Sequence, residues 1–264
     1  MPSKERILTE QIEKKQITIT PMADSHCHLD LLDEKDIKEA IINGVQVIIT
    51  DGVDTRSNME TLKIADNINI FAAIGVDPEH SALSEEELNF NIGLLKSNLN
   101  KVVAVGEIGL DRKIAIDQKQ YDQQKKVFEK MLDAALDLNL PVSIHARDSI
   151  GDVLKILSEK NVKKAHLHFF DGNLEQAKLA EKFGYMISIP PFKSSKRSMI
   201  IKDIAIDNIM AESDAPAAGK NPIDVKRAIE FIASVKGIQF EKAADILLAN
   251  TKEFFGINTM LMYR

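Results

Sequence analysis

The side chains best suited to chemistry in this sequence are histidines and carboxylates that close short apolar runs. His26 and His28 stand two residues apart at the end of the first such run. Residues i and i+2 of a strand share a face, so both imidazoles are predicted to point the same way, as binding to one metal ion requires. Cys27 then points to the opposite side and is predicted to be a small packed residue.

Four further residues of these types close other apolar runs. They are Glu107, His145, His168 and Asp214. Burying such groups is costly unless they are paired or bind a metal. Histidine together with carboxylates suits divalent ions such as Zn²⁺ or Mn²⁺, and Mg²⁺ stays open as a third candidate. Six ligands exceed what one tetrahedral ion takes, so the set predicts two divalent metal ions with Glu107 as a bridge between them.

Each of these residues also has a structural interpretation when taken alone. His145 alone is more typical of a histidine satisfied by its neighbours at a strand end than of a ligand, and Asp214 before Ala-Pro is typical of a turn or a helix cap. The agreement of five separate strand ends favours the metal site. His166 shares the face of His168 but lies deeper, so it is predicted to support the site or pack in the core. For His80 the functional and the solvated interpretations both stay open.

The apolar runs alternate with amphipathic segments along the whole chain. Eight runs are predicted to be strands, at 17–28, 45–52, 70–76, 102–108, 141–146, 165–170, 185–190 and 209–214. Segments with helical spacing lie at 36–43, 55–67, 84–98, 121–138, 150–160, 174–183, 195–205, 222–236 and 240–255. Strict alternation predicts a parallel sheet, and eight units favour a (β/α)₈ TIM-type barrel over a doubly wound sheet.

The barrel is predicted to be a single domain, because no Pro/Gly/Ser-rich linker divides the chain. It is expected to cover residues 17–258, with a charged extension at 1–16 and a short tail at 259–264. With 264 residues and a formal charge of −6, a generally basic nucleic-acid coat is excluded, although a local basic patch is not. One cysteine, no signal peptide and no long apolar span predict a cytoplasmic protein without membrane contact.

Six short stretches, taken together, resemble the TatD family of metal-dependent deoxyribonucleases in the amidohydrolase superfamily. They are DSHCHLD at 24–30, GVDP at 75–78, GEIGLD at 106–111, LPVSIHAR at 140–147, HFFDG at 168–172 and ESDAP at 212–216. The resemblance covers most of the chain and implies a distorted barrel with a two-metal site formed by His26, His28, Glu107, His145, His168 and Asp214. The sequence departs from the family pattern at 77–78, at 169–172 and in the short loop at 217–222.

The activity implied by the resemblance is metal-dependent cleavage of DNA phosphodiester bonds, often as a 3′→5′ exonuclease. Its expected substrate is DNA, single-stranded or at an end, without sequence specificity. Asp214 is the candidate general base as well as a ligand, with Glu107 as the second catalytic residue. Arg147, Arg112 and Lys193 follow strand ends and are candidates for holding flanking phosphates.

Two other functions are compatible with the same residues. The first is a binuclear hydrolase of C–N or ester bonds in a small molecule. Many such enzymes of the superfamily carry a carboxylated lysine as the bridge, whereas the bridge position here is Glu107, which favours the nuclease. The second is a metal-binding scaffold without catalysis. The oligomeric state is left open by the sequence.

Overall fold

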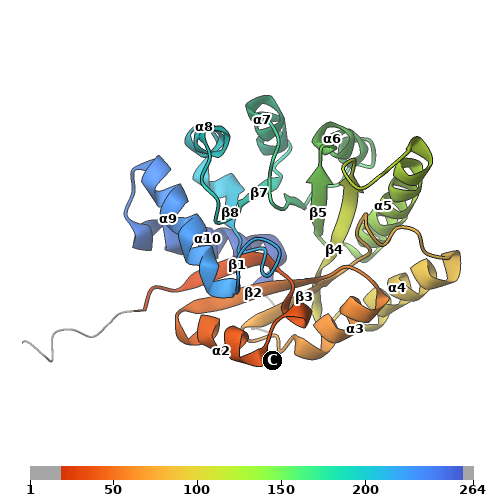
Figure 1. The fold of residues 1–264 in the computed structure, drawn as a ribbon, viewed down its shortest axis with the longest axis horizontal. Helices are drawn as coiled ribbons and strands as arrows, with labels where there is room; N and C mark the ends of the chain where they lie inside the picture. The colour runs from red at the N-terminus through yellow and green to blue at the C-terminus, as the bar shows by residue number, and fades with distance from the viewer. Residues whose placement is uncertain (1–18, 258–264) are drawn as a thin grey trace, which may run out of the picture.

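The protein forms a barrel of eight parallel strands surrounded by helices, as seen in the computed structural model, which describes residues 19–257 (Figure 1). The strands pair in chain order from β1 to β8, which confirms the predicted single-domain (β/α)₈ barrel. A doubly wound sheet would reverse its strand order partway. The extension at 1–16 and the tail at 259–264 lie outside the described residues. Between residues 19 and 257, no helix is long and apolar enough to cross a bilayer.

The bounds of the elements follow the predicted alternation. The strands are β1 Met22–Cys27, β2 Val45–Gly52, β3 Ile70–Ile74, β4 Val102–Asp111, β5 Val142–Arg147, β6 Ala165–Leu167, β7 Met186–Ile189 and β8 Ile209–Ala211. The α-helices are α2 Glu34–Ile42, α3 Thr55–Ile64, α4 Glu85–Ser97, α5 Gln118–Leu138, α6 Ile150–Glu159, α7 Leu174–Lys182, α8 Ser195–Asp203, α9 Val225–Lys236 and α10 Phe240–Phe255. Short 3₁₀ helices lie at Leu29–Leu31, Ile206–Asn208 and Pro222–Asp224.

Several strand ends differ from those predicted. β4 continues to Asp111, so Glu107 lies inside the strand and not at its end. β6 ends at Leu167 and β8 at Ala211, so His168 and Asp214 lie just beyond their strands. Their backbone amides still donate hydrogen bonds to the neighbouring strands, to Ile144 and His26 respectively, each over 3.0 Å. Apolar patterning marks burial, and burial extends past the point where regular strand pairing stops.

The barrel closes between β1 and the segment after β8 through individual hydrogen bonds. The amide of His28 donates to the carbonyl of Ala215 over 2.8 Å. The carboxylate of Asp24 accepts hydrogen bonds from both the amide and the hydroxyl of Ser213. These bonds hold the ends of the first and last strands side by side, which brings His26 and Asp214 together.

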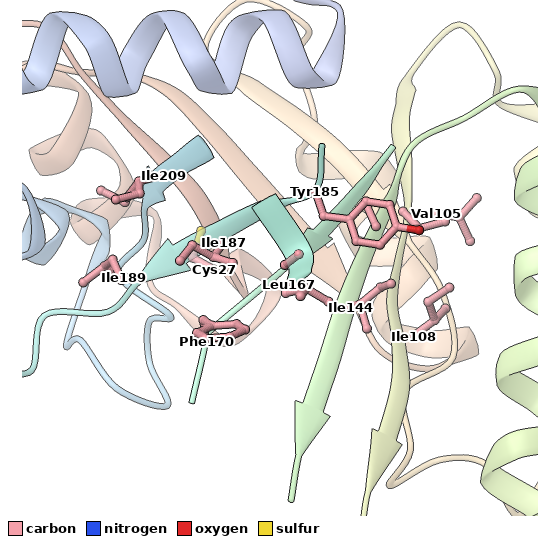
Figure 2. Packing of buried hydrophobic residues seen from close by; sticks show 14 of the residues in the cluster. Cys27, Val105, Ile108, Ile144, Leu167, Phe170, Tyr185, Ile187, Ile189 and Ile209 are labelled. Carbon is pink, nitrogen blue, oxygen red and sulfur yellow. The ribbon is translucent and has the colours of Figure 1, made fainter. Parts of the chain in front are cut away.

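Two apolar clusters stabilise the fold. The larger lies between the strands and the surrounding helices and includes Cys27, Ile144, Leu167 and Ile187 (Figure 2). Cys27 therefore points out of the barrel, as predicted. The smaller cluster fills the amino-terminal half of the barrel interior and is called the floor here. The floor consists of Ala23, Val47, Ile49, Phe71, Ala73, Val103, Ala104, Met186, Met210, Phe254, Phe255 and Ile257. Its last members come from the end of α10 and the residues that follow it.

Candidate metal centre

The inward-facing positions of the strands change from apolar to polar toward their carboxyl ends. On β2, Val47 and Ile49 belong to the floor, and Asp51 follows two residues later. On β8, Met210 belongs to the floor and Glu212 is the next inward residue. Because inward positions recur every second residue, a polar layer forms at the carboxyl-terminal end of the barrel. This end, which carries the six candidate ligands, is called the mouth here. Active sites of such barrels are built at this end.

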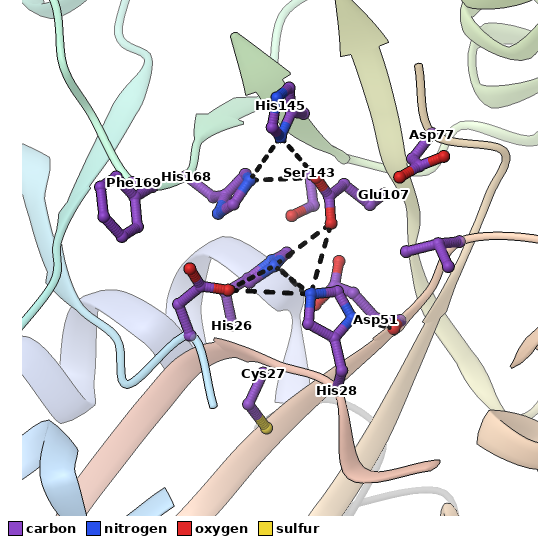
Figure 3. A network of polar contacts seen from close by, with 12 residues as sticks. His26, Cys27, His28, Asp51, Asp77, Glu107, Ser143, His145, His168 and Phe169 are labelled. Carbon is purple, nitrogen blue, oxygen red and sulfur yellow. Dashed lines mark hydrogen bonds and ion pairs between the residues drawn. The ribbon is translucent and has the colours of Figure 1, made fainter. Parts of the chain in front are cut away.

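Glu107 lies at the centre of this mouth (Figure 3). Its Oε2 is 3.4 Å from Nε2 of His26 and 3.5 Å from Nε2 of His28. Its Oε1 is 2.8 Å from Nδ1 of His145 and 3.1 Å from Nε2 of His168. One carboxylate therefore faces two separate histidine pairs with different oxygens, which is the geometry expected of a bridging ligand.

Asp214 completes the group of six residues singled out in the sequence. Its Oδ1 lies 3.9 Å from Nε2 of His26 and 3.7 Å from Nε2 of His28. Asp214 has a φ of 47°, a left-handed conformation that is uncommon outside glycine. Two overlapping groups have ligand atoms close enough to hold a metal ion. They are His26, His28 and Asp214, and His26, Glu107 and His168.

The outer hydrogen bonds of two histidines determine which of their ring nitrogens carries the hydrogen in the neutral ring. Nδ1 of His28 lies 2.9 Å from the backbone carbonyl of Asp51, which can only accept, so this nitrogen carries the hydrogen. Nε2 of His145 lies 2.9 Å from the carboxylate of Asp111 and donates to it in the same way. In the neutral rings, the other nitrogens, Nε2 of His28 and Nδ1 of His145, carry the lone pairs and face the centre, as in metal-binding histidines.

The residues at the mouth fit divalent metal ions. Nε2 of His26 and Nε2 of His28 face each other over 3.3 Å. Nδ1 of His26 lies 3.2 Å from the carboxylate of Asp51, which favours a hydrogen on that nitrogen and a lone pair on Nε2. In the neutral rings, two lone pairs would face each other beside the carboxylates of Glu107 and Asp214, and they would repel one another unless a proton or a metal ion lies between them. Imidazole nitrogens and carboxylate oxygens are also the ligands that Zn²⁺ and Mn²⁺ prefer.

The pKa values of His26, His145 and Glu107 show the same demand for positive charge, whereas burial lowers the pKa of His168. Burial lowers the pKa of His26, but Asp51 and Glu107 outweigh burial and raise it well above its ordinary value. Burial likewise opposes the change at His145, where Asp111 and Glu107 raise the pKa to about 10. Burial raises the pKa of Glu107, and the neighbouring histidines more than reverse this and hold it well below its usual range. Protons supply here the charge that metal ions supply when bound.

A chain of hydrogen bonds lies between the mouth and the floor. The hydroxyl of Ser188 donates to Glu212 over 2.6 Å and lies 2.7 Å from Nε2 of His166, which donates to it. The hydroxyl of Ser143 lies 3.4 Å from Nδ1 of His166. Glu212 also accepts from the amide of Phe169 over 2.6 Å. Burial lowers the pKa of His166 well below its ordinary value, so this histidine stays neutral and supports the layer above it, as its depth predicted.

Four buried acids without a predicted role position the mouth. Asp51 and Asp111 contact His26, His28 and His145, whereas Asp24 and Glu212 hold the segments on either side of the closure. The available signal was an acidic residue at an inward position of an otherwise apolar strand, which Asp51 and Asp111 both show. Such a residue is costly to bury unless a specific partner forms a hydrogen bond or an ion pair with it.

The three predicted phosphate-binding cations differ in their surroundings. Arg112 is held by Asp152 over 2.7 Å, and its guanidinium lies 3.8 Å from the centre of the Tyr121 ring. Arg147 and Lys193 are exposed and form no ion pair with any residue between 19 and 257. Of the three, Arg147 and Lys193 are free to contact a substrate, and Arg112 is already engaged.

A pocket of about 510 Å³ opens beside the mouth. Its lining includes His145, His168 and Asp214 from the mouth, Arg147 from the end of β5, and Phe169 from the loop after β6. Three of the six candidate ligands, among them the candidate base Asp214, therefore border a space large enough for a small ligand. A larger pocket lies under α2 and α3, away from these residues.

Comparison with known proteins places the chain in a family. Residues 23–256 match the family described as TatD related DNase. The Bacillus subtilis metal-dependent hydrolase YabD is 32% identical, over 89% of this chain and 99% of its own length. The human deoxyribonuclease TATDN3 is 26% identical, over 89% and 94%. The crystal structure of YjjV, a TatD homologue from Escherichia coli, superposes with a TM-score of 0.83 at 26% identity, over 90% of this chain and 99% of that one. The chain therefore belongs to the TatD family of metal-dependent hydrolases.

Proposed function

We propose that the protein is a deoxyribonuclease that hydrolyses DNA phosphodiester bonds with two divalent metal ions. The observation that carries this proposal is the position of Glu107, whose two oxygens face two histidine pairs at the mouth of the barrel. The deoxyribonuclease name of the human relative supports DNA as the substrate. The small-molecule hydrolase remains the alternative, and the experiment below separates the two.

The distances support a division of the six residues between two ion sites. His26, His28, Asp214 and Oε2 of Glu107 would hold one ion. His145, His168 and Oε1 of Glu107 would hold the other. When bound, such ions lower the pKa of water at the site and neutralise charge on the phosphate oxygens. The mixed nitrogen and oxygen ligands favour Zn²⁺ or Mn²⁺ over Mg²⁺, which prefers oxygen.

The residues of the chain bind the substrate, orient the metal ligands and accept the proton of the attacking water. Asp214 borders the pocket and serves as the general base, accepting the proton of the attacking water at its carboxylate. Asp111 fixes the ring of His145, and the Asp51 carbonyl fixes the ring of His28. Arg147 and Lys193 hold flanking phosphates of single-stranded DNA or of an end, without reading sequence. Because the chain carries a formal charge of −6, binding is expected to be modest and sensitive to salt.

The test uses a 5′-labelled single-stranded oligonucleotide and the full-length protein. EDTA should abolish cleavage, and adding back Mn²⁺, Zn²⁺ or Mg²⁺ separately should restore it and rank the metals. Progressive shortening of the labelled strand would identify the 3′→5′ exonuclease expected for the family. Asp214→Ala should reduce cleavage by about 10²–10⁴-fold. Asp207→Ala, on the exposed turn before β8, is the matched control and should leave the rate unchanged.

Two results would contradict the proposal. Metal-loaded protein that leaves DNA uncut but hydrolyses amides or lactones would support the small-molecule hydrolase. Asp214→Ala protein that retains every measured activity would place catalysis elsewhere, or reduce the mouth to a metal-binding scaffold.

A further inference from the structure

An arginine that the sequence did not single out lines the pocket beside the mouth. Arg197 lies in the first turn of α8, and only 9% of its surface is exposed. It borders the same pocket as His168 and Asp214, together with Phe169 and Phe192. A buried guanidinium is rare unless its charge and its N–H groups are satisfied.

Most donors of Arg197 lack good partners. Its Nη1 lies 3.5 Å from the carbonyl of Phe192, the outer limit of a hydrogen bond, and its Nη2 lies 3.9 Å from the carboxylate of Asp171. Asp171 is held more closely by Lys196, over 2.5 Å. In the part of the chain that the structure describes, Nε of Arg197 is buried without a hydrogen-bond partner. A guanidinium has five N–H donors, so this residue has several left for an anion in the pocket.

Two aromatic side chains stand next to this cation. The guanidinium carbon of Arg197 lies 5.2 Å from the centre of the Phe169 ring, within the range of a cation–π contact. The rings of Phe169 and Phe192 are 6.4 Å apart, and 41% of Phe192 is exposed. Phe169 also lies beside His168 at the mouth (Figure 3). The pocket therefore places a poorly paired guanidinium and exposed aromatic surface directly beside the candidate metal ligands.

We propose that this pocket binds the nucleotide next to the cleaved bond, with Arg197 donating to its phosphate and Phe192 and Phe169 stacking against its base. The inference rests on the proposed function, because it takes the substrate to be a nucleic acid. Paired N–H groups of arginine match the oxygens of a phosphate, and stacking on aromatic rings tolerates any base. The pocket volume of about 510 Å³ is within the range of sites for ligands of this size.

The test measures binding apart from cleavage. The probe is a fluorescent single-stranded oligonucleotide with phosphorothioate linkages that resist hydrolysis, titrated with metal-loaded full-length protein at several salt concentrations. Arg197→Gln should weaken binding about tenfold and lower the slope of log K against log salt by about 0.7, the value for one phosphate contact on a single strand. Arg197→Lys should keep the slope and lose only part of the affinity, because it keeps the charge and loses the paired donors.

Phe192→Ala tests the stacking surface. It should weaken binding about fivefold or more without changing the salt slope, and the loss should vanish when the probe is abasic. Lys202→Gln is the matched control, because Lys202 is an exposed cation in the last turn of the same helix. It should bind within twofold of the unmodified protein. Thermal melting of each variant shows that it is folded.

The outcomes separate this inference from the proposed function. If folded Arg197→Gln binds the probe with the unchanged affinity and slope while the unmodified protein cleaves DNA, the pocket assignment is wrong and the nuclease stands. If the unmodified protein cuts no DNA but its binding depends on Arg197 as described, the pocket stands and the proposed reaction fails.

Discussion

The floor and the mouth of the barrel are built from neighbouring residues of the same chain segments, yet different interactions stabilise the two regions. In the floor, Phe71, Met210 and Phe255 pack against other apolar side chains, and their side chains carry no group that requires a hydrogen bond. Two residues after Met210 and just beyond β8, Glu212 needs specific hydrogen bonds from Ser188 and from the amide of Phe169. The floor is stabilised by removing apolar surface from water, whereas the mouth is arranged by charge and hydrogen bonding.

The difference shows where a barrel of this kind can carry chemistry. The floor is closed by the end of α10 and is independent of any ligand. At the mouth, the acids raise the pKa values of His26 and His145 against the effect of burial, so these acids favour positive charge beside them. Stability and function should therefore respond to different substitutions at the two ends, and the following predictions test that separation.

Glu107→Gln should have the largest effect on function. The amide cannot act as an anionic bridge between the two histidine pairs, so we expect the metal content to fall from two ions toward one. Cleavage should fall by about 10²–10⁴-fold. Metal analysis of the purified protein and single-turnover kinetics measure these changes. Unchanged metal content would show that Glu107 does not bridge the ions.

Phe71→Ala should have the largest effect on stability and little effect on the mouth. Phe71 is fully buried in the floor, and deleting such a ring costs about 3–5 kcal/mol of unfolding free energy. Urea unfolding at fixed metal concentration measures this cost. Phe90→Ala on α4 is the matched control, because Phe90 is 50% exposed and its loss should stay within about 0.5 kcal/mol. A folded Phe71→Ala protein with greatly reduced metal affinity would contradict the separation of the two ends.

Asp111→Asn should have an intermediate effect confined to the mouth. Asp111 holds Nε2 of His145 over 2.9 Å, and removing such a partner of a metal-binding histidine typically costs 10–100-fold in metal affinity or activity. Asp133→Asn on the exposed face of α5 provides the control. Metal titration by calorimetry should show one weakened site and one unchanged site. Equal weakening of both sites would mean that Asp111 acts on the whole mouth and not through His145.

His80 should show the smallest effect, on the loop after β3. A hydrogen bond to Asp77 raises the pKa of His80 above its ordinary 6.5, although partial burial acts in the other direction. The pair therefore stabilises the fold below pH 6.5, and this contribution is lost as the pH rises through the higher folded-state pKa. An NMR titration of the His80 ring should show the raised pKa, and Asp77→Asn should return it toward 6.5. A pKa that is the same in both proteins would show that this ion pair is absent in solution.

The fold was predictable from the sequence because each element carries its own local signal. The long amphipathic segment after β4 follows Asp117, an acid typical of helix caps, whose carboxylate accepts from the amide of Gln120 over 2.8 Å. Apolar runs separated by such helices predict parallel strands, and the chain order of the barrel follows. Strand ends were less predictable. Burial continues beyond regular pairing at His168 and Asp214, and regular pairing continues beyond Glu107.

The candidate site was predictable in its principal residues and not in its supports. Histidines and acids at the ends of apolar runs stand out because nothing about an apolar strand requires them. Arg197 gave no such signal, because an arginine in the first turn of a helix is typical of solvent-exposed surface. Its burial against Phe169 depends on how the loops after β6 and β7 pack together.

By itself the sequence determined the alternation of elements, the barrel and the chemical character of the mouth, because periodicity and residue type are local properties. Only the tertiary structure decided that Glu107 faces two histidine pairs and that Asp51 and Asp111 orient the rings around it. It also decided that Arg112 is engaged by Asp152 whereas Arg197 lines the pocket. Distances between residues far apart in the chain are set by closure of the barrel, and no local pattern records them.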